Sequence, residues 1–199
     1  MKLQAIKRIC AKNKTIHVVH VDGESFVGDG EGFYTLGDLS GIDKEVLFQI
    51  FDIKEDDAAK YDYQDLLSFP IPGVDIGVRS EDITLVTSPL SINLAGRTVV
   101  PVLLHTDQHI ALYNPVYISP FTDDMRELSL CERANAQGQA YIVIKKGFSV
   151  MAVIFPDRED LPVLHDRMKA FFPLLRDTMI AEGYASEYPD EDRQTTFDD

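Results

Sequence analysis

Apolar residues are most concentrated between positions 141 and 155, where two runs of mostly β-branched residues flank a short polar turn. Lys145, Lys146 and Gly147 form that turn, and Pro156 ends the second run. Strands that are apolar on both faces belong inside a sheet rather than at its edge. The pattern therefore predicts a β-hairpin in the interior of a larger antiparallel sheet, covered by the helix that follows it in the chain.

The N-terminal quarter of the chain combines one helical period with a series of short strand patterns. Leu3, Ile6 and Ile9 recur every three residues among basic positions, which predicts an amphipathic helix over residues 2–12. Turn sequences rich in aspartate and glycine separate the apolar segments that follow, and such spacing favours an antiparallel meander. Its strands are expected at residues 15–21, 25–27 and 32–36.

A second helix and a polar connection are predicted after the meander. Val46, Leu47 and Ile50 supply one apolar face of a helix over residues 44–51. Residues 52–63 are rich in aspartate and lysine, so this segment is interpreted as a surface connection.

The strand pattern returns after residue 73. Short apolar runs separated by turn residues predict consecutive antiparallel strands, and residues 108–118 add a further strand or a turn and a strand. In residues 122–136, Thr122 can cap a helix whose inward positions include Leu128 and Cys131. The consecutive strands are expected at residues 74–78, 83–87, 90–94 and 98–104.

The last apolar stripe of the chain predicts a long helix. Asp160 is the expected cap, Pro173 predicts a kink or a restart because it lacks a backbone amide, and Gly183 is expected to end the helix. The inward positions fall at intervals of three or four residues: Leu164, Met168, Phe171, Leu175 and Met179.

These elements together predict an α+β fold with antiparallel β-sheets and covering helices. Residues 1–182 are interpreted as one α+β domain, or as two intimately packed lobes with a boundary near residues 54–73. Residues 183–199 are strongly acidic, which predicts a disordered tail.

Composition places the chain among soluble globular proteins, with 45% apolar and 26% charged residues in a length of 199. No apolar run approaches the roughly 20 residues that are needed to cross a bilayer. The N-terminal segment has no signal-peptide core, so cytoplasmic residence without a membrane partner is the expectation. The net charge of −14 implies repulsion of nucleic acid at long range.

The first 14 residues depart from this acidic balance, because they contain five basic residues and no acidic one. Lys7, Arg8, Lys12 and Lys14 are the candidate nucleic-acid-binding residues, since such side chains can neutralise phosphates without reading a base sequence. The alternative interpretation is a solvated helix face that balances an acidic body.

Residues typical of catalytic and metal sites occur in the sequence without a recognisable arrangement. The glycine-rich segment 28–32 lies between two predicted strands and contains two acids, so a tight hairpin turn is favoured over a phosphate-binding loop. His105 and His109 flank Asp107, but the surrounding pattern indicates a strand, a turn and a strand, in which the two imidazoles need not converge. His17 and His20 are expected on opposite faces of one strand.

No nucleophile motif, metal site or cofactor is therefore predicted, and no catalytic residue is assigned. Cys10 and Cys131 are far apart in the sequence and are expected to be small buried thiols, both in helical surroundings.

Residues 110–157 resemble the final repeat of DNA polymerase sliding clamps. The similar pieces are the junction Leu112-Tyr113-Asn114-Pro115-Val116-Tyr117-Ile118, the helix-like segment 122–136 and the closing strand that ends Val153-Ile154-Phe155-Pro156; residues 74–104 are compatible with the strands of the same fold. The resemblance implies a non-enzymatic protein in which basic helices line a ring, formed by a closed homo-oligomer. The chain departs from that pattern by beginning with a helix and by having an acidic segment at 122–136.

Two functional interpretations follow. The first is a non-enzymatic accessory or binding module with clamp-like architecture that contacts DNA or a replication partner. The second is a small acidic protein-interaction factor, such as an inhibitor, an immunity-type protein or a nucleic-acid mimic, whose acidic surface binds a basic partner.

Overall fold

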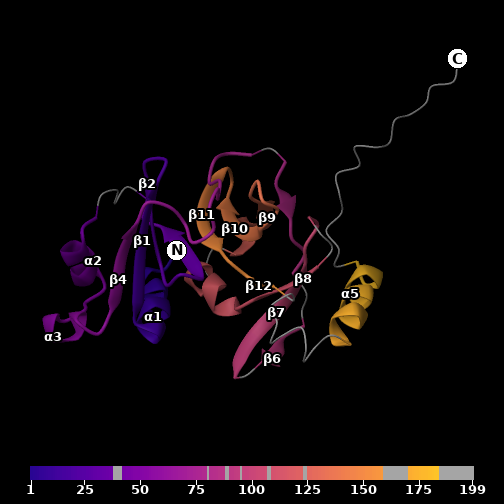
Figure 1. The fold of residues 1–199 in the computed structure, drawn as a ribbon, viewed down its shortest axis with the longest axis horizontal. Coiled ribbons are helices and arrows are strands. Elements are labelled where there is room, and N and C mark those ends of the chain that lie inside the picture. Colours follow the sequence, from indigo (N-terminus) through magenta and orange to yellow (C-terminus); the bar gives the residue numbers. More distant parts are fainter. Residues whose placement is uncertain are drawn as a thin grey trace, which may run out of the picture.

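Two β-sheets and the helices that cover them form the structure, a computed structural model that describes residues 1–37, 42–79, 81–87, 90–94, 96–106, 109–122, 125–158 and 170–183 (Figure 1). The larger sheet has eight strands in the order β4-β1-β2-β3-β11-β10-β9-β5, and the smaller has the order β12-β8-β7-β6. Among the described residues, β1 and β4 are parallel, and every other strand pair is antiparallel. The predicted α+β class with antiparallel sheets and covering helices is confirmed.

The predicted N-terminal helix and meander are confirmed. Helix α1 (Leu3–Asn13) buries Ile6, Ile9 and Cys10, and its last carbonyls are capped by Lys14 in a left-handed conformation. Strands β1 (Thr15–Val21), β2 (Glu24–Gly28) and β3 (Gly32–Thr35) pair in sequence order.

Helix α2 (Lys44–Ile50) is also confirmed, and the Asp43 carboxylate caps it by accepting from the amide of Val46 at 2.8 Å. The interpretation of residues 52–63 as a surface connection is only partly right, because they contain helix α3 (Glu55–Ala58) and the start of strand β4 (Asp62–Leu66). Strand β4 is polar and lies at the edge of the large sheet, parallel to β1, so it lacks the apolar alternation that identifies a buried strand.

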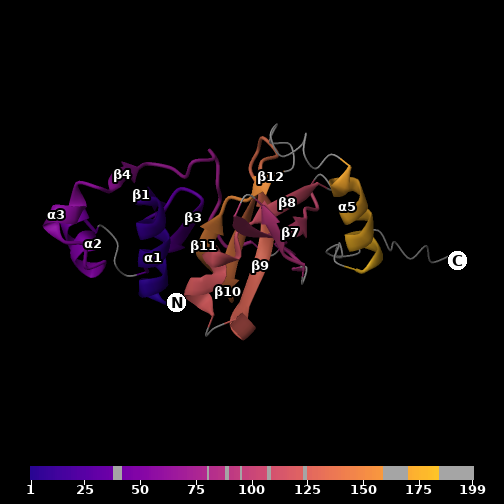
Figure 2. The same ribbon diagram turned by 90° about the horizontal axis from the view of Figure 1, so that it is seen from below.

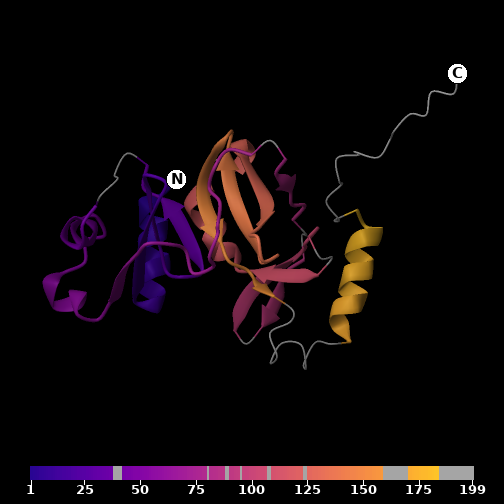
Figure 3. The same cartoon turned by 45° about the horizontal axis from the view of Figure 1, so that its top comes forward.

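The central hairpin consists of β10 (Ala140–Lys146) and β11 (Ser149–Ile154), and its interior position is confirmed. Strand β11 pairs with β3 and β10 pairs with β9 (Leu128–Ala134), so neither hairpin strand is an edge. Figure 3 shows the hairpin between the N-terminal strands and the small sheet.

The cover of this hairpin differs from the prediction. Ile142 and Ile144 belong to the same apolar cluster as the buried face of α1, whereas Tyr141 and Val143 pack with Phe69 on the other face. The expectation that the C-terminal helix covers the hairpin is therefore wrong.

The helix predicted at residues 122–136 is wrong as well, because a short 3₁₀ turn, η2 (Met125–Glu127), leads into strand β9. In a helix, Glu132 and Arg133 would belong to a solvent-facing polar stripe, which is why the apolar spacing resembles that of a helix. In the structure both residues are buried. Their side chains are satisfied across the fold: Glu132 accepts from the amides of His105 and Thr106, and Arg133 donates to Asp82. Tertiary pairing thus overrides the local pattern.

The small sheet contains β6 (Ile92–Leu94), β7 (Arg97–Leu103), β8 (Ile110–Tyr113) and β12 (Asp157–Arg158). The strands predicted at 90–94 and 98–104 are confirmed, and residues 108–118 contain β8 followed by a 3₁₀ helix, η1 (Pro115–Phe121).

The first two of the predicted consecutive strands differ from the expectation. Strand β5 (Ile83–Thr84) is shorter than predicted and pairs with β9 instead of its sequence neighbours. Residues 74–78 form no strand, and the backbone there is held by side chains, for example by the Tyr141 hydroxyl, which accepts from the amide of Asp75 at 2.9 Å.

Helix α5 (Phe171–Ala181) covers the small sheet, where Phe172, Leu175 and Met179 pack with residues of β7 and β8 (Figure 2). Pro173 lies in its first turn, and Gly183 follows its end with φ 74°, as predicted for a helix stop. The predicted cap Asp160, the stripe residues Leu164 and Met168, and tail residues 184–199 lie outside the described part of the chain. Among the helices that are described, none combines the length and apolarity needed to cross a membrane.

A cationic pocket between α1 and η1

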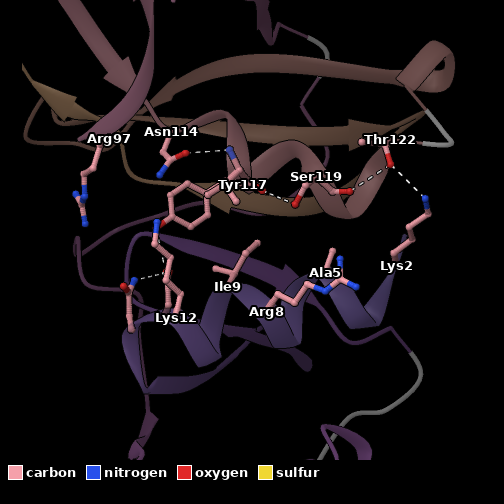
Figure 4. Close-up of a pocket in the computed structure, with 13 residues that line it drawn as sticks. Lys2, Ala5, Arg8, Ile9, Lys12, Arg97, Asn114, Tyr117, Ser119 and Thr122 are labelled. Carbon is pink, nitrogen blue, oxygen red and sulfur yellow. Dashed lines mark hydrogen bonds between the residues drawn. The ribbon is translucent and has the colours of Figure 1, made fainter. Parts of the chain in front are cut away.

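A cavity of about 520 Å³ lies between α1 and η1 (Figure 4). Two of its basic side chains, Arg8 and Lys12, come from α1, Lys2 comes from the residue just before that helix, and Arg97 comes from the start of β7. The lining residues are Lys2, Ala5, Arg8, Ile9, Lys12, Asn13, Asp29, Arg97, Asn114, Val116, Tyr117, Ser119 and Thr122. Segments that are far apart in the sequence thus bring basic side chains to one cavity.

Both walls of the pocket are fixed by local structure. Helix α1 is anchored through the buried side chains of Ile6 and Cys10, which leaves its Arg8 side toward the cavity. The side-chain oxygen of Asn114 accepts from the amide of Val116 at 3.0 Å and so caps η1. The two walls meet where the backbone amide of Lys2 donates to the carbonyl of Pro120 at 2.6 Å.

The structure divides the four predicted nucleic-acid-binding residues into two pairs. Arg8 and Lys12, one helical turn apart, both line the pocket. Lys7 instead lies 3.6 Å from the carboxylate of Asp52, and the Lys14 ammonium lies 4.7 Å from the centre of the Tyr61 ring. Only the first pair therefore contributes to a shared site.

Arg8 and Lys12 make no hydrogen bond or ion pair with any other residue that the structure describes. Figure 4 shows both side chains on the side of α1 that faces η1. Because no carboxylate in the described part of the chain forms an ion pair with them, their charges are available to an anionic ligand.

Sequence reasoning missed two contributors to this pocket. Arg97 is the first residue of β7 and has no basic neighbour in the sequence, and its guanidinium lies 3.5 Å from the Glu31 carboxylate. In the sequence, Asn114 is only one residue of a strand-to-helix junction. Neither residue carries a local signal, because each reaches the pocket through the packing of η1 and β7 against the N-terminal elements.

Asp29 is the acidic residue of the pocket, and its carboxylate is hydrogen-bonded to other groups of the protein. Its Oδ1 accepts from the amides of Glu31 and Gly32 at 3.2 and 3.1 Å. Its Oδ2 accepts from the Asn13 amide at 2.9 Å and lies 3.0 Å from the Tyr117 hydroxyl. The glycine-rich segment 28–32 is thus a hairpin turn, as predicted, and its carboxylate joins α1, the turn and η1.

Tyr117 completes this network as a neutral phenol. Its hydroxyl also lies 2.9 Å from a carboxylate oxygen of Glu31. Burial and then the negative charges of Asp29 and Glu31 raise the pKa of Tyr117 far above its ordinary value. The side chain therefore ties the wall together and does not serve as a base near neutral pH.

No protein family, curated protein or solved structure matches this chain.

The segment that contains His105 and His109 connects two strands, as the sequence predicted. His105 and His109 flank the turn between β7 and β8, where the amide of Leu104 donates to the carbonyl of His109 at 2.9 Å. Burial lowers the pKa of His105, with the nearby Glu132 carboxylate acting in the opposite direction. Asp107 lies outside the described residues.

The described residues contain no group of three or more histidine, cysteine, aspartate or glutamate side chains that could hold a metal ion. Cys10 and Cys131 are both buried free thiols, as predicted, although Cys131 lies on strand β9 and not in a helix. Burial raises the pKa of both thiols, which disfavours the reactive thiolate. The pocket offers hydrogen-bond donors and positive charge, and these groups suit the binding of an anionic ligand.

Proposed function

We propose that this chain is a non-enzymatic binding module that contacts nucleic-acid phosphates through the pocket between α1 and η1. The observation that carries the proposal is the convergence of Arg8 and Lys12 with Lys2 and Arg97 on one cavity. This local concentration of positive charge contrasts with the net charge of −14.

An acidic protein can bind a phosphate at such a site because electrostatic attraction acts over short distances in salt. The Debye length is about 8 Å at physiological ionic strength, so distant carboxylates are screened while contact cations are not. Binding that replaces counterions on the nucleic acid must weaken as the salt concentration rises.

Charge reversal on α1 tests the proposal with a matched control. Arg8→Glu with Lys12→Glu is expected to abolish binding of labelled DNA, because it turns the pocket from attractive to repulsive. Lys7→Glu with Lys14→Glu makes the same change of net charge on or next to the same helix, yet it is expected to leave binding within about twofold, because neither side chain lines the pocket. Fluorescence anisotropy measures both dissociation constants, and circular dichroism checks that the helix is retained.

Salt titration sharpens the same experiment. Between about 50 and 200 mM salt, the wild-type dissociation constant is expected to rise steeply, with a slope that falls by about one for each phosphate-contacting cation that is removed. Equal losses of binding in both double variants would point to net charge rather than to this pocket, and the proposal would be abandoned. An absence of DNA binding by the wild-type protein at low salt would have the same consequence.

The resemblance to sliding clamps stays a prediction. One of its pieces, the helix expected at 122–136, is replaced by β9, while the basic helix at the N-terminus is present as α1. A DNA-encircling ring, with a replication partner docked on it, would require a closed homo-oligomer, and light scattering in solution measures the mass directly.

A second candidate function, binding of a basic protein, is favoured by the acidic edge of the large sheet. Strand β4 is an edge strand in which Asp62 and Asp65 are exposed, and Glu55 and Asp56 of α3 are exposed just before it. Asp56→Lys with Asp62→Lys is expected to weaken binding of a labelled oligolysine peptide at least about tenfold, because opposite charges then become like charges. Arg8→Glu with Lys12→Glu should leave that binding intact, and the reverse pattern would exclude this candidate.

A further inference from the structure

The pocket between α1 and η1 is bridged at both of its ends. At one end, the Lys2 amide donates to Pro120, and the Lys2 ammonium donates to the Thr122 hydroxyl at 3.3 Å. At the other end, the Asp29 carboxylate links Asn13 of α1 to Tyr117 of η1. Figure 4 shows the hydrogen bond between the Lys2 side chain and Thr122. These contacts join the two walls of the pocket, so it suits a compact group better than a strand that passes between α1 and η1.

The size of the cavity agrees with a compact ligand. Its volume of about 520 Å³ lies within the range of roughly 300–1,000 Å³ that is typical of small-molecule sites. A DNA duplex is wider than the cavity, so only a protruding group or a single nucleotide can enter it.

The polar groups that remain available in the pocket are mainly donors. Arg8, Lys12 and the amide nitrogen of Asn114 have no hydrogen-bond partner among the residues that the structure describes, because only the side-chain oxygen of Asn114 caps η1. The carboxylate of Asp29 already accepts from two backbone amides and receives further hydrogen bonds from side chains. The site therefore selects a ligand with several acceptor oxygens and concentrated negative charge.

A phosphomonoester fits this description better than a phosphodiester. A monoester carries a charge between about −1.5 and −2 at neutral pH and presents three acceptor oxygens, whereas each internal phosphate of a strand carries a single charge. Arg8 and Lys12 are separated by about 6 Å along the helix, one turn, so both can act on one terminal phosphate or on it and its neighbour. The apolar side chains of Ala5, Ile9 and Val116 line the same cavity and can contact the rest of a nucleotide.

We propose that the pocket between α1 and η1 binds the phosphomonoester of a nucleotide, as the phosphorylated end of a strand or as a free nucleotide, and not the internal backbone of a duplex. The inference rests on the proposed nucleic-acid-binding function and narrows it to one ligand chemistry.

The test compares ligands of equal sequence that differ only at their ends. Labelled single strands with a 5′-phosphate, with a 3′-phosphate and with hydroxyls at both ends are titrated with the full chain, together with a circular single strand that has no end. At least one phosphorylated strand is expected to bind about tenfold more tightly than the hydroxyl strand, because a charge-assisted contact is lost without the monoester. Competition with nucleoside monophosphate and diphosphate then separates a strand end from a free nucleotide.

Asn114→Asp supplies a variant that should keep the fold. Aspartate caps a helix as well as asparagine does, so η1 is retained, while the new charge repels a phosphomonoester. The preference for the phosphorylated strand is expected to disappear in this variant, and the variant's thermal unfolding midpoint should stay close to that of the wild type.

The possible results separate the two proposals. Equal binding of phosphorylated, hydroxyl and circular strands would overturn the end-binding inference and leave the nucleic-acid-binding function in place. Displacement of the phosphorylated strand by free nucleotide supports the inference and identifies a free nucleotide as a ligand. Failure of every strand and nucleotide to bind at low salt would overturn both.

Discussion

Asp82→Asn is expected to destabilise the protein by about 3–5 kcal/mol, because it leaves two buried cations without their counter-charge. The Asp82 side chain is 5% exposed and contacts Arg133, which is 1% exposed, and Lys145, which is 10% exposed. Arg133 donates to both carboxylate oxygens, at 2.6 and 2.9 Å, and Lys145 donates to one of them. Urea unfolding followed by circular dichroism measures the loss.

An aspartate in an exposed ion pair supplies the control. Asp57 pairs with Lys60 at 2.6 Å on the surface, so Asp57→Asn makes the same chemical change where water can solvate the remaining charge. It is expected to produce no resolvable shift in the urea midpoint. If Asp82→Asn unfolded at the wild-type urea concentration, the buried network would have no stabilising role and the prediction would be wrong.

The effect of Asp82 should also depend on pH in a defined direction. Burial alone would raise the pKa of Asp82, but the hydrogen bonds from Arg133 and Lys145 outweigh it and hold the pKa below its ordinary value. A carboxylate with a lowered pKa stabilises the fold above the pKa it has when unfolded, about 3.9, and this contribution is lost as the pH falls through the folded value. The stability difference between wild type and Asp82→Asn should therefore shrink below about pH 4.

The same network explains why the sequence predicts some elements and not others. The hairpin at residues 141–155 and helix α1 follow from apolar periodicity, because their buried positions are apolar with the exception of Lys145. Strand β9 was missed because Glu132 and Arg133 are buried on it as partners of distant groups. A charged residue in the sequence normally indicates exposure, and only the three-dimensional partners reveal the exception.

The cover of the central sheet was misassigned for a related reason. Helix α5 has an apolar stripe and follows the hairpin in the chain. Such a stripe shows that the helix packs against an apolar surface, but it does not show which surface that is. The small sheet offers Val99, Leu103 and Leu112 to α5, while the N-terminal helix packs against the hairpin. Which of two apolar surfaces a helix packs against depends on the paths of the connecting segments, and the apolar periodicity does not reveal those paths.

The site was predictable in part. Charge clustering identifies α1 as the basic element, and the helical period could place Arg8 and Lys12 on one face. The helical period could not show that Lys7 pairs with Asp52 or that Lys14 contacts the Tyr61 ring. It could not show that Arg97 lines the pocket either, because all three neighbours come from other elements. The tight turn at residues 28–32 contacts Tyr117 in the η1 wall of this pocket, so substitutions of its glycines should affect both stability and binding.

Gly28→Ala is expected to destabilise the protein by about 3 kcal/mol or more, because there is no room for a methyl group between β2 and β3. A Cβ atom at Gly28 would lie 1.9 Å from the carbonyl oxygen of Gly32 and 2.9 Å from the Cα atom of Phe33. Both of these atoms belong to the backbone of the partner strand, so no side-chain rotation can relieve the clash. Thermal or urea unfolding measures the loss.

Gly32→Ala meets a different obstacle and therefore distinguishes a backbone clash from a side-chain clash. A Cβ atom at Gly32 would lie 2.5 Å from Cδ1 of the Tyr117 ring, so its expected effect of about 1–3 kcal/mol should largely vanish in a Tyr117→Ala background. The effect of Gly28→Ala should be the same in both backgrounds, since Tyr117 is not among its nearest atoms. An undiminished effect of Gly32→Ala beside Tyr117→Ala would contradict this packing. Because Tyr117 lines the pocket, Gly32→Ala should also weaken the binding of a phosphorylated strand, whereas a glycine that served only the turn would leave that binding unchanged.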